Sequence, residues 1–219
     1  MDSSRLAELV AGWCEDNCDW GLPWRRSPTP WGVLVAALLL RKTTARQAAA
    51  VYEEFVRRYP EPRALLQAPE EELKALLRPL GIENQRARLF KELARELAEK
   101  FGGQVPCNRE ALESLPGVGP YAASEVLLFA CGEPEPLLDR NVVRLLERAL
   151  GLKSSRKRPH TDPELWRKAR ELIPRGPAAL KVSLGLLDLA RKVCTARNPK
   201  CGGCPLRDTC LYAKQRQRT

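Results

Sequence analysis

The predicted fold of this chain is built around the stretch Leu115-Pro116-Gly117-Val118-Gly119-Pro120-Tyr121. Two glycines separated by one residue, with a proline on either side, cannot continue a helix, because glycine loses backbone entropy there and proline has no amide hydrogen. Helix-like segments at 109–114 and 122–131 flank the stretch, so it predicts a tight turn between two helices. Amides at the start of a helix can bind phosphate. We therefore expect a phosphate-binding helix-hairpin-helix, with an ordinary glycine-terminated turn as the alternative.

The rest of the sequence predicts an all-α fold, because apolar residues recur at helical spacing and no segment alternates with period two. The first helix starts near residue 4, and Asp139 is placed to cap the helix 140–150. We read residues 22–30 as an irregular linker. The other expected helices cover residues 31–59, 63–66, 69–77, 84–101, 163–172 and 178–193.

Composition and charge point to a polyanionic partner. The chain has 219 residues, with 37 Lys and Arg against 27 Asp and Glu, and a formal net charge of +10 spread over its whole length. This favours nucleic acid over a membrane surface, with a basic but inert surface as the alternative. No run of 18 apolar residues and no basic leader segment is present, so we expect a cytoplasmic protein.

Four cysteines near the C-terminus indicate a metal centre. Cys194, Cys201, Cys204 and Cys210 have the spacing C-x6-C-x2-C-x5-C. Four soft ligands suit a zinc ion or a [4Fe–4S] cluster. Zinc modules usually combine two C-x2-C pairs and only one is present, so we favour the cluster; two disulfides are a third option.

The remaining cysteines carry weaker signals. Cys14 and Cys18 lie four residues apart, a spacing that permits shared metal ligation. We interpret them instead as two free, buried, apolar side chains. The sequence assigns no role to Cys107 and Cys131.

The hairpin, the Asp139 that follows Gly119 by twenty residues, and the cysteine spacing together resemble the helix-hairpin-helix DNA glycosylase superfamily, the endonuclease III and MutY relatives. The resemblance implies a six-helix domain at 27–136 and an iron–sulfur cluster domain made of 1–26 and 137–219. It also implies that Asp139 stabilises the cationic sugar formed when the N-glycosidic bond breaks, or helps to activate water; a pure helix cap is the alternative.

The same resemblance assigns DNA contacts and a structural cluster. It implies that the hairpin binds the DNA backbone, and that the basic loop with Arg197 and Lys200 is presented to DNA by the cluster. The hairpin residues concerned are Leu115, Gly117, Val118 and Gly119.

Two positions predict the reaction subtype. Bifunctional relatives carry a lysine where this chain has Tyr121, and tyrosine cannot form a Schiff base, so the resemblance implies a monofunctional enzyme. MutY-type adenine glycosylases carry a glutamate where this chain has Ala37. The chain is also too short for their C-terminal domain, and both points disfavour adenine excision.

The sequence is most similar to the archaeal mismatch thymine glycosylases of the Mig type. The similar runs are Arg41–Ala45, Asn84–Ala87, Lys91–Arg95, Leu115–Gly119 with Tyr121, and Leu184–Asp188. The similarity implies a monomer that removes thymine or uracil from G·T and G·U mismatches in double-stranded DNA, in the nucleoid. It places Lys42 and Ile82 as wedges that fill the vacated space, and Tyr121 in the base pocket; Lys42 and Ile82 could equally be ordinary surface and packing residues.

Those enzymes carry a glutamate at the position of Ala37, so other functions stay open. A glycosylase for another damaged base, an adenine glycosylase and a non-catalytic DNA-binding iron–sulfur protein are the alternatives.

Overall fold

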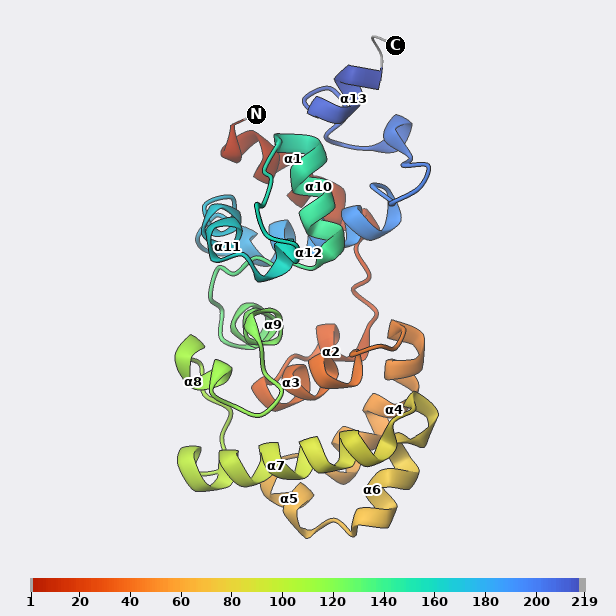
Figure 1. The fold of residues 1–219 in the computed structure, drawn as a ribbon, viewed down its shortest axis with the longest axis vertical. Coiled ribbons are helices and arrows are strands. Elements are labelled where there is room, and N and C mark those ends of the chain that lie inside the picture. Colours follow the sequence, from red (N-terminus) through yellow and green to blue (C-terminus); the bar gives the residue numbers. More distant parts are fainter. Residues whose placement is uncertain (1, 217–219) are drawn as a thin grey trace. The chain divides into compact units, whose positions relative to one another are not determined.

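The structure is a computed structural model and describes residues 2–216. These residues form helices and no strand, which confirms the all-α prediction (Figure 1). The helices are α1 (Ser3–Asn17), α2 (Pro23–Arg26), α3 (Pro30–Leu39), α4 (Ala45–Arg58), α5 (Pro62–Gln67), α6 (Glu70–Leu77), α7 (Glu83–Phe101), α8 (Arg109–Glu113), α9 (Pro120–Ala130), α10 (Arg140–Leu150), α11 (Pro163–Arg170), α12 (Ala178–Lys192) and α13 (Leu211–Arg216), with short 3-10 helices η1 (Arg78–Leu80), η2 (Pro159–Thr161) and η3 (Cys201–Gly203).

The chain divides into two compact units. One consists of Trp20–Cys131, and the other combines Met1–Asp19 with Gly132–Thr219. The domain limits expected from the sequence, at residues 27 and 136, stay a prediction. None of the helices in the described part of the chain is long and apolar enough to cross a membrane.

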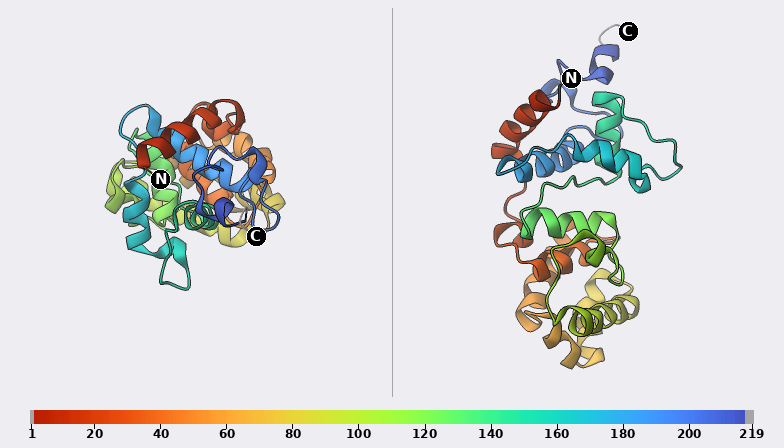
Figure 2. Two further views of the ribbon diagram at one scale, coloured as in Figure 1. Left: turned by 90° about the horizontal axis from the view of Figure 1, so that it is seen from above. Right: turned by 90° about the vertical axis from the view of Figure 1, so that its left-hand side faces the viewer.

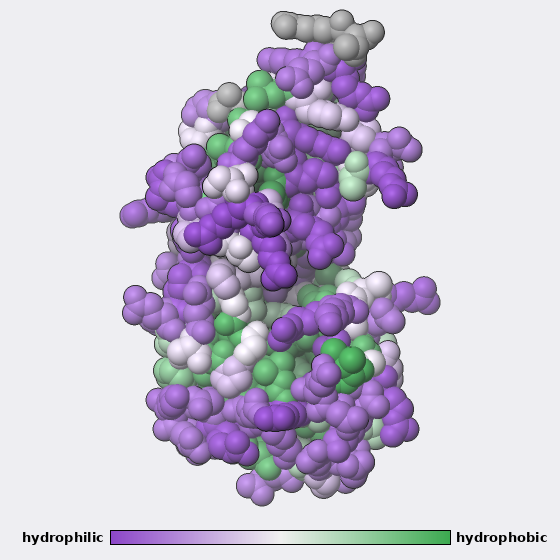
Figure 3. Space-filling view, in the orientation of Figure 1, coloured by the Kyte–Doolittle hydropathy of each residue, from purple (hydrophilic) through white to green (hydrophobic). Residues whose placement is uncertain are grey.

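The unit of residues 20–131 is built around α3. Residues 31–39 of this helix are all buried, because α2, α4 and α9 pack against it. Helix α7 packs on α5 and α6, and the rings of Phe55 and Phe90 meet in this core with centroids 4.7 Å apart. The helix-hairpin-helix of α8 and α9 belongs to this unit. On the face drawn in Figure 3, apolar side chains reach the surface chiefly over this unit.

The single helix expected over 31–59 is wrong, because α3 and α4 are separate helices. Helix α3 ends at Leu39, and Lys42 adopts a left-handed conformation with φ 58°. Thr44 then caps α4 in a reciprocal capping box with Gln47. Thr44 and Gln47 form the Thr-x-x-Gln signature of a helix start. The expected linker at 22–30 likewise contains a short helix, α2.

The second unit packs α1 along α12, as the right-hand view of Figure 2 shows. Gly185 of α12 allows this close approach, because a Cβ there would lie 2.6 Å from Val10 Cγ1 and 2.9 Å from Val10 O. The fully buried carboxylate of Asp188 accepts a hydrogen bond of 2.8 Å from the amide of Asp19. Helix α10 also packs against α12.

Four cysteines form disulfides. Cys14 and Cys18 are joined at the end of α1, with Cα atoms 4.8 Å apart, so the prediction of two free buried thiols is wrong. Cys18 directly follows the last residue of α1 and has an extended backbone, which lets its side chain reach that of Cys14, one turn earlier in the helix. A second disulfide joins Cys107 to Cys131 and closes a loop around the hairpin, with a sequence separation of 24. Such a loop closure stabilises a fold by about 3 kcal/mol.

Candidate functional site

The hairpin turn requires glycine at position 117. Gly117 has φ 74°, in the left-handed region that residues with a Cβ avoid. A Cβ at this position would lie 2.8 Å from Leu89 Cδ1 on α7 and 3.1 Å from Arg41 Nη1. Gly119 differs, since its φ is −106° and a Cβ there would meet nothing within 4 Å. The turn therefore packs tightly on one side and is open on the other.

Two of the four predicted hairpin contacts offer free amides. Within the described residues, the amides of Gly117 and Gly119 donate to no backbone carbonyl, whereas Val118 N–H donates to Leu115 O at 3.1 Å. Leu115 and Val118 are 3% and 6% exposed, so their side chains pack the hairpin. The DNA contacts expected at all four hairpin positions stay a prediction. Gly119 is also the N-cap of α9, where the helix dipole favours an anion.

Asp139 is held as the N-cap of α10, as predicted. Its Oδ1 accepts hydrogen bonds from the amides of Asn141 (2.7 Å) and Val142 (2.8 Å). Its Oδ2 accepts one bond of 2.6 Å from Asn141 Nδ2. The side chain is partly exposed, and Oδ2 retains an acceptor site. The carboxylate is therefore fixed in orientation and still open to an external group.

A chain of hydrogen bonds leads from Asp139 to the C-terminal cysteines. Asn141 Oδ1 accepts a bond of 3.2 Å from Arg144 Nη1. Arg144 in turn donates from Nε to Cys194 O and from Nη2 to Ala190 O, both at 2.9 Å. Neither Asn141 nor Arg144 is predicted from the sequence. Their spacing after Asp139, in the run Asp-Arg-Asn-Val-Val-Arg, is the signal that could have indicated them.

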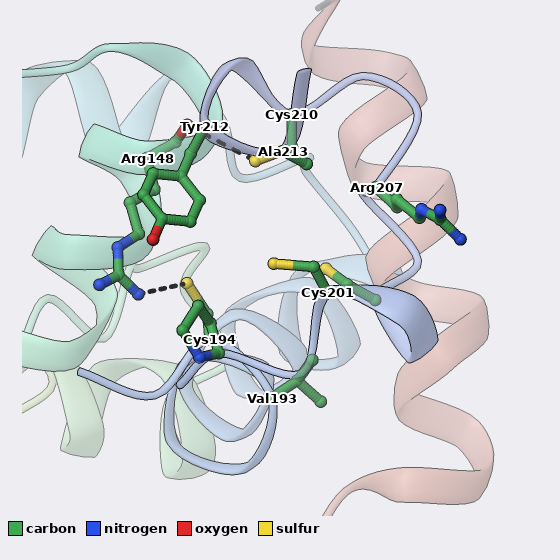
Figure 4. A pocket seen from close by; sticks show the side chains of 10 residues that line it. Arg148, Val193, Cys194, Cys201, Arg207, Cys210, Tyr212 and Ala213 are labelled. Atoms are coloured by element: carbon green, nitrogen blue, oxygen red, sulfur yellow. Dashed lines mark hydrogen bonds between the residues drawn. The ribbon is translucent and has the colours of Figure 1, made fainter. Parts of the chain in front are cut away.

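The four C-terminal cysteines are free thiols that line one pocket. Figure 4 shows the sulfurs of Cys194, Cys201 and Cys210 directed into it. Arg148 Nη1 lies 3.7 Å from Cys194 Sγ and donates to Thr195 O at 2.7 Å. Among residues 2–216, no three His, Cys, Asp or Glu side chains are arranged for direct metal ligation.

The pocket chemistry fits a cationic metal group. Burial, and to a smaller extent the nearby thiols of Cys194, Cys210 and Cys201, raise the pKa of the Cys204 thiol to about 11. Clustered thiols become thiolates only if a positive centre compensates their charge. Four sulfur donors suit iron or zinc.

The other predicted residues lie on the two units as follows. Ala37, 8% exposed, belongs to α3, and the half-buried Tyr121 begins α9, which packs against α3. Lys42 and Ile82 line a pocket of about 230 Å³ in the unit of residues 20–131, and Ile82 is 47% exposed. The remaining predicted contacts are exposed side chains of the loop between α12 and η3, Arg197 and Lys200.

Comparisons with known proteins identify the family. Residues 35–173 match the model of HhH-GPD superfamily base excision DNA repair proteins, and residues 194–210 match the iron–sulfur binding domain of endonuclease III. The chain belongs to the HhH-GPD superfamily of base excision DNA repair proteins.

Individual relatives cover nearly the whole chain. A thymine-DNA glycosylase of Aeropyrum pernix is 56% identical, over 97% of each chain. A thymine/uracil-DNA glycosylase of Pyrobaculum aerophilum is 54% identical, over 100% of this chain and 96% of that one. A solved structure of a thermostable thymine-DNA glycosylase matches with a TM-score of 0.90 and 33% identity, over 97% of both chains. The chain is thus a DNA glycosylase, a hydrolase of base excision repair, with an iron–sulfur binding segment.

Proposed function

We propose that the enzyme is a monofunctional glycosylase that removes thymine or uracil from G·T and G·U mismatches in double-stranded DNA. The observation that carries this proposal is the fixed, accessible carboxylate of Asp139 in an enzyme with no lysine at position 121. The names of the relatives from Aeropyrum pernix and Pyrobaculum aerophilum support the choice of base. We expect the enzyme to act as a monomer in the cytoplasm, on the nucleoid.

Hydrolysis breaks the bond between C1′ of the sugar and N1 of the pyrimidine. The bonding electrons leave with the base, and positive charge develops on the sugar. Asp139 stabilises this charge because three hydrogen bonds hold its carboxylate in place before the reaction begins. Water then adds its oxygen to C1′ and loses a proton, which the departing base takes up. The product is an abasic sugar in an intact strand.

Tyr121 limits the reaction to hydrolysis. An amine at this position would attack C1′ and form an imine, after which the strand would break. The phenol of Tyr121 has no nitrogen for such a bond, and its place at the start of α9 suits a wall of the base pocket. Ala37 contributes no acid, so departure of the base depends on the mismatch and on Asp139.

The proposed DNA contacts are electrostatic. The free amides of Gly117 and Gly119 bind one phosphate, and the side chains of Arg197 and Lys200 bind others. We further propose that Cys194, Cys201, Cys204 and Cys210 hold a [4Fe–4S] cluster. Such a group, when bound, would fix the loop that carries Arg197 and Lys200.

The substitution Asp139→Asn tests the role of the carboxylate. Asparagine can still accept the amide bonds of the helix cap but carries no charge, so we expect the single-turnover rate of base release to fall by at least about 100-fold. DNA affinity should stay close to that of the wild type. Quantification of released base at saturating enzyme measures the rate.

Asp162→Asn is a matched control in the same unit. Asp162 caps α11 with a bond of 3.0 Å to Glu164 N and accepts a bond from Ser154 Oγ, but the proposal gives it no part in the chemistry. We expect this variant to unfold at a lower temperature and to retain the rate. An Asp139→Asn enzyme with wild-type rates would show that Asp139 is a helix cap alone.

A further inference from the structure

Two exposed residues of the unit of residues 20–131 have left-handed backbone conformations. Lys42, between α3 and α4, has φ 58°, and Ile82, the residue before α7, has φ 48°. This conformation costs about 1–2 kcal/mol for a residue with a Cβ, and it is least favourable for a β-branched side chain. It persists only where the surrounding structure holds it. Some group must therefore fix both turns.

Arg86, in the second turn of α7, is hydrogen-bonded to both turns. Its Nε donates to Gly81 O at 3.0 Å, which is the carbonyl directly before one left-handed residue. Its Nη2 donates to Arg41 O at 2.6 Å, directly before the other, and its Nη1 donates to Leu38 O at 3.0 Å. One planar guanidinium thus joins two turns that are about 40 residues apart in sequence.

Burying the charged guanidinium of Arg86 costs free energy. Arg86 is 4% exposed, and no carboxylate forms an ion pair with it in the part of the chain that the structure describes. Burial, together with the neighbouring Arg41, lowers the pKa of Arg86. Backbone carbonyls near the C-terminal end of α3 attract the cation, but they do not neutralise it. A packing residue at this position would not need a charge.

The two turns lie beside the hairpin. Lys42 and Ile82 line the same pocket as Arg86 and Leu89. Leu89 is also the side chain that a Cβ on Gly117 would strike, at 2.8 Å. The phosphate-binding turn and the two left-handed turns are therefore neighbours within one compact unit.

We propose that Arg86 is a positioning residue that holds Lys42 and Ile82 in the conformation in which they enter the DNA duplex as the target base leaves it. The inference rests on the proposed glycosylase function and adds a residue that contacts neither the base nor the sugar. Flipping a base costs a few kcal/mol, and wedge side chains that are already oriented recover part of this cost. Arg86 thus supports base flipping and has no part in bond cleavage.

The test compares two duplexes that differ in how tightly the uracil is held. One contains a single G·U pair, and in the other the pairs flanking the G·U are also mismatched, so that the uracil is weakly stacked. Arg86→Lys keeps the charge but lacks the planar fork, and Arg86→Met keeps the side-chain length without charge. We expect single-turnover rates to fall about 10- to 100-fold on the first duplex and by less than about threefold on the second.

Lys91→Met is the matched control. Lys91 also lies on α7 and donates to two backbone carbonyls, Leu66 O at 3.0 Å and Ala68 O at 2.5 Å, which belong to α5 and its C-terminal cap. Its loss should lower the unfolding temperature and change the rates on both duplexes by the same factor. An equal loss on both duplexes for Arg86→Lys would reduce Arg86 to a structural role and overturn the proposal.

A second readout separates this proposal from the proposed function. In the Asp139→Asn background, 2-aminopurine placed next to the uracil reports flipping without base release. We expect the fluorescence to rise on binding and the added Arg86→Lys to reduce that rise. An unchanged rise would overturn the role of Arg86. If the wild type released no base but Arg86→Lys still reduced the fluorescence rise, the proposed function alone would fail.

Discussion

At the scale of single residues, the orientation of the Asp139 carboxylate also depends on residues that do not contact it directly. Asn141 bonds to Asp139 and to Arg144, and Arg144 reaches the carbonyl of Cys194. The first predicted cluster ligand is thus three hydrogen bonds away from the proposed catalytic group. Residues of this kind orient a reacting group without touching the substrate.

A substitution at position 121 is predicted to add a second activity to the enzyme. Tyr121→Lys places a primary amine at the first turn of α9, and we expect a measurable strand-cleaving activity through an imine with the abasic sugar. Borohydride reduction during the reaction should trap a covalent protein–DNA adduct. Tyr121→Phe is the control and should give none. The absence of any adduct from the lysine variant would contradict the placement of this residue in the pocket.

At the scale of elements, the hairpin gives a prediction that separates its two glycines. Gly117→Ala combines a φ of 74° with a Cβ 2.8 Å from Leu89, so we expect a loss of at least about 1–2 kcal/mol in the free energy of unfolding. Gly119→Ala meets no atom within 4 Å and should be close to neutral for stability. Denaturant unfolding of both variants measures the difference; equal stabilities would contradict the tight turn.

The sequence predicted the hairpin, the cap at Asp139 and the helical class, because each has a local signal in glycine, proline or periodicity. The break between α3 and α4 was missed, because the apolar residues 31–40 continue into a run with no glycine or proline. Only the Thr44 and Gln47 pair marks the new helix start. Long-range contacts carry no such local signal. The three carbonyl partners of Arg86 and the link from Asn141 to Cys194 become visible only in the folded chain.

At the scale of the whole molecule, the net charge of +10 predicts binding that weakens with salt. We expect a steep negative slope of log affinity against log salt, reduced by about two in the double variant Arg197→Ser, Lys200→Ser. Arg167→Ser is the control, because Arg167 is already paired with Glu164 at 2.7 Å. Fluorescence anisotropy at several salt concentrations measures the slope. A slope near zero would contradict the phosphate contacts.

We propose that this chain hydrolyses the bond to a mismatched pyrimidine and leaves the strand intact. The test measures single-turnover base release from labelled duplexes that contain G·T, G·U, A·8-oxoG or damaged bases, each analysed with and without alkali. We predict strand breaks with G·T and G·U only, and only after alkali. Breaks without alkali, breaks confined to other substrates, or no breaks despite tight binding would contradict the claim.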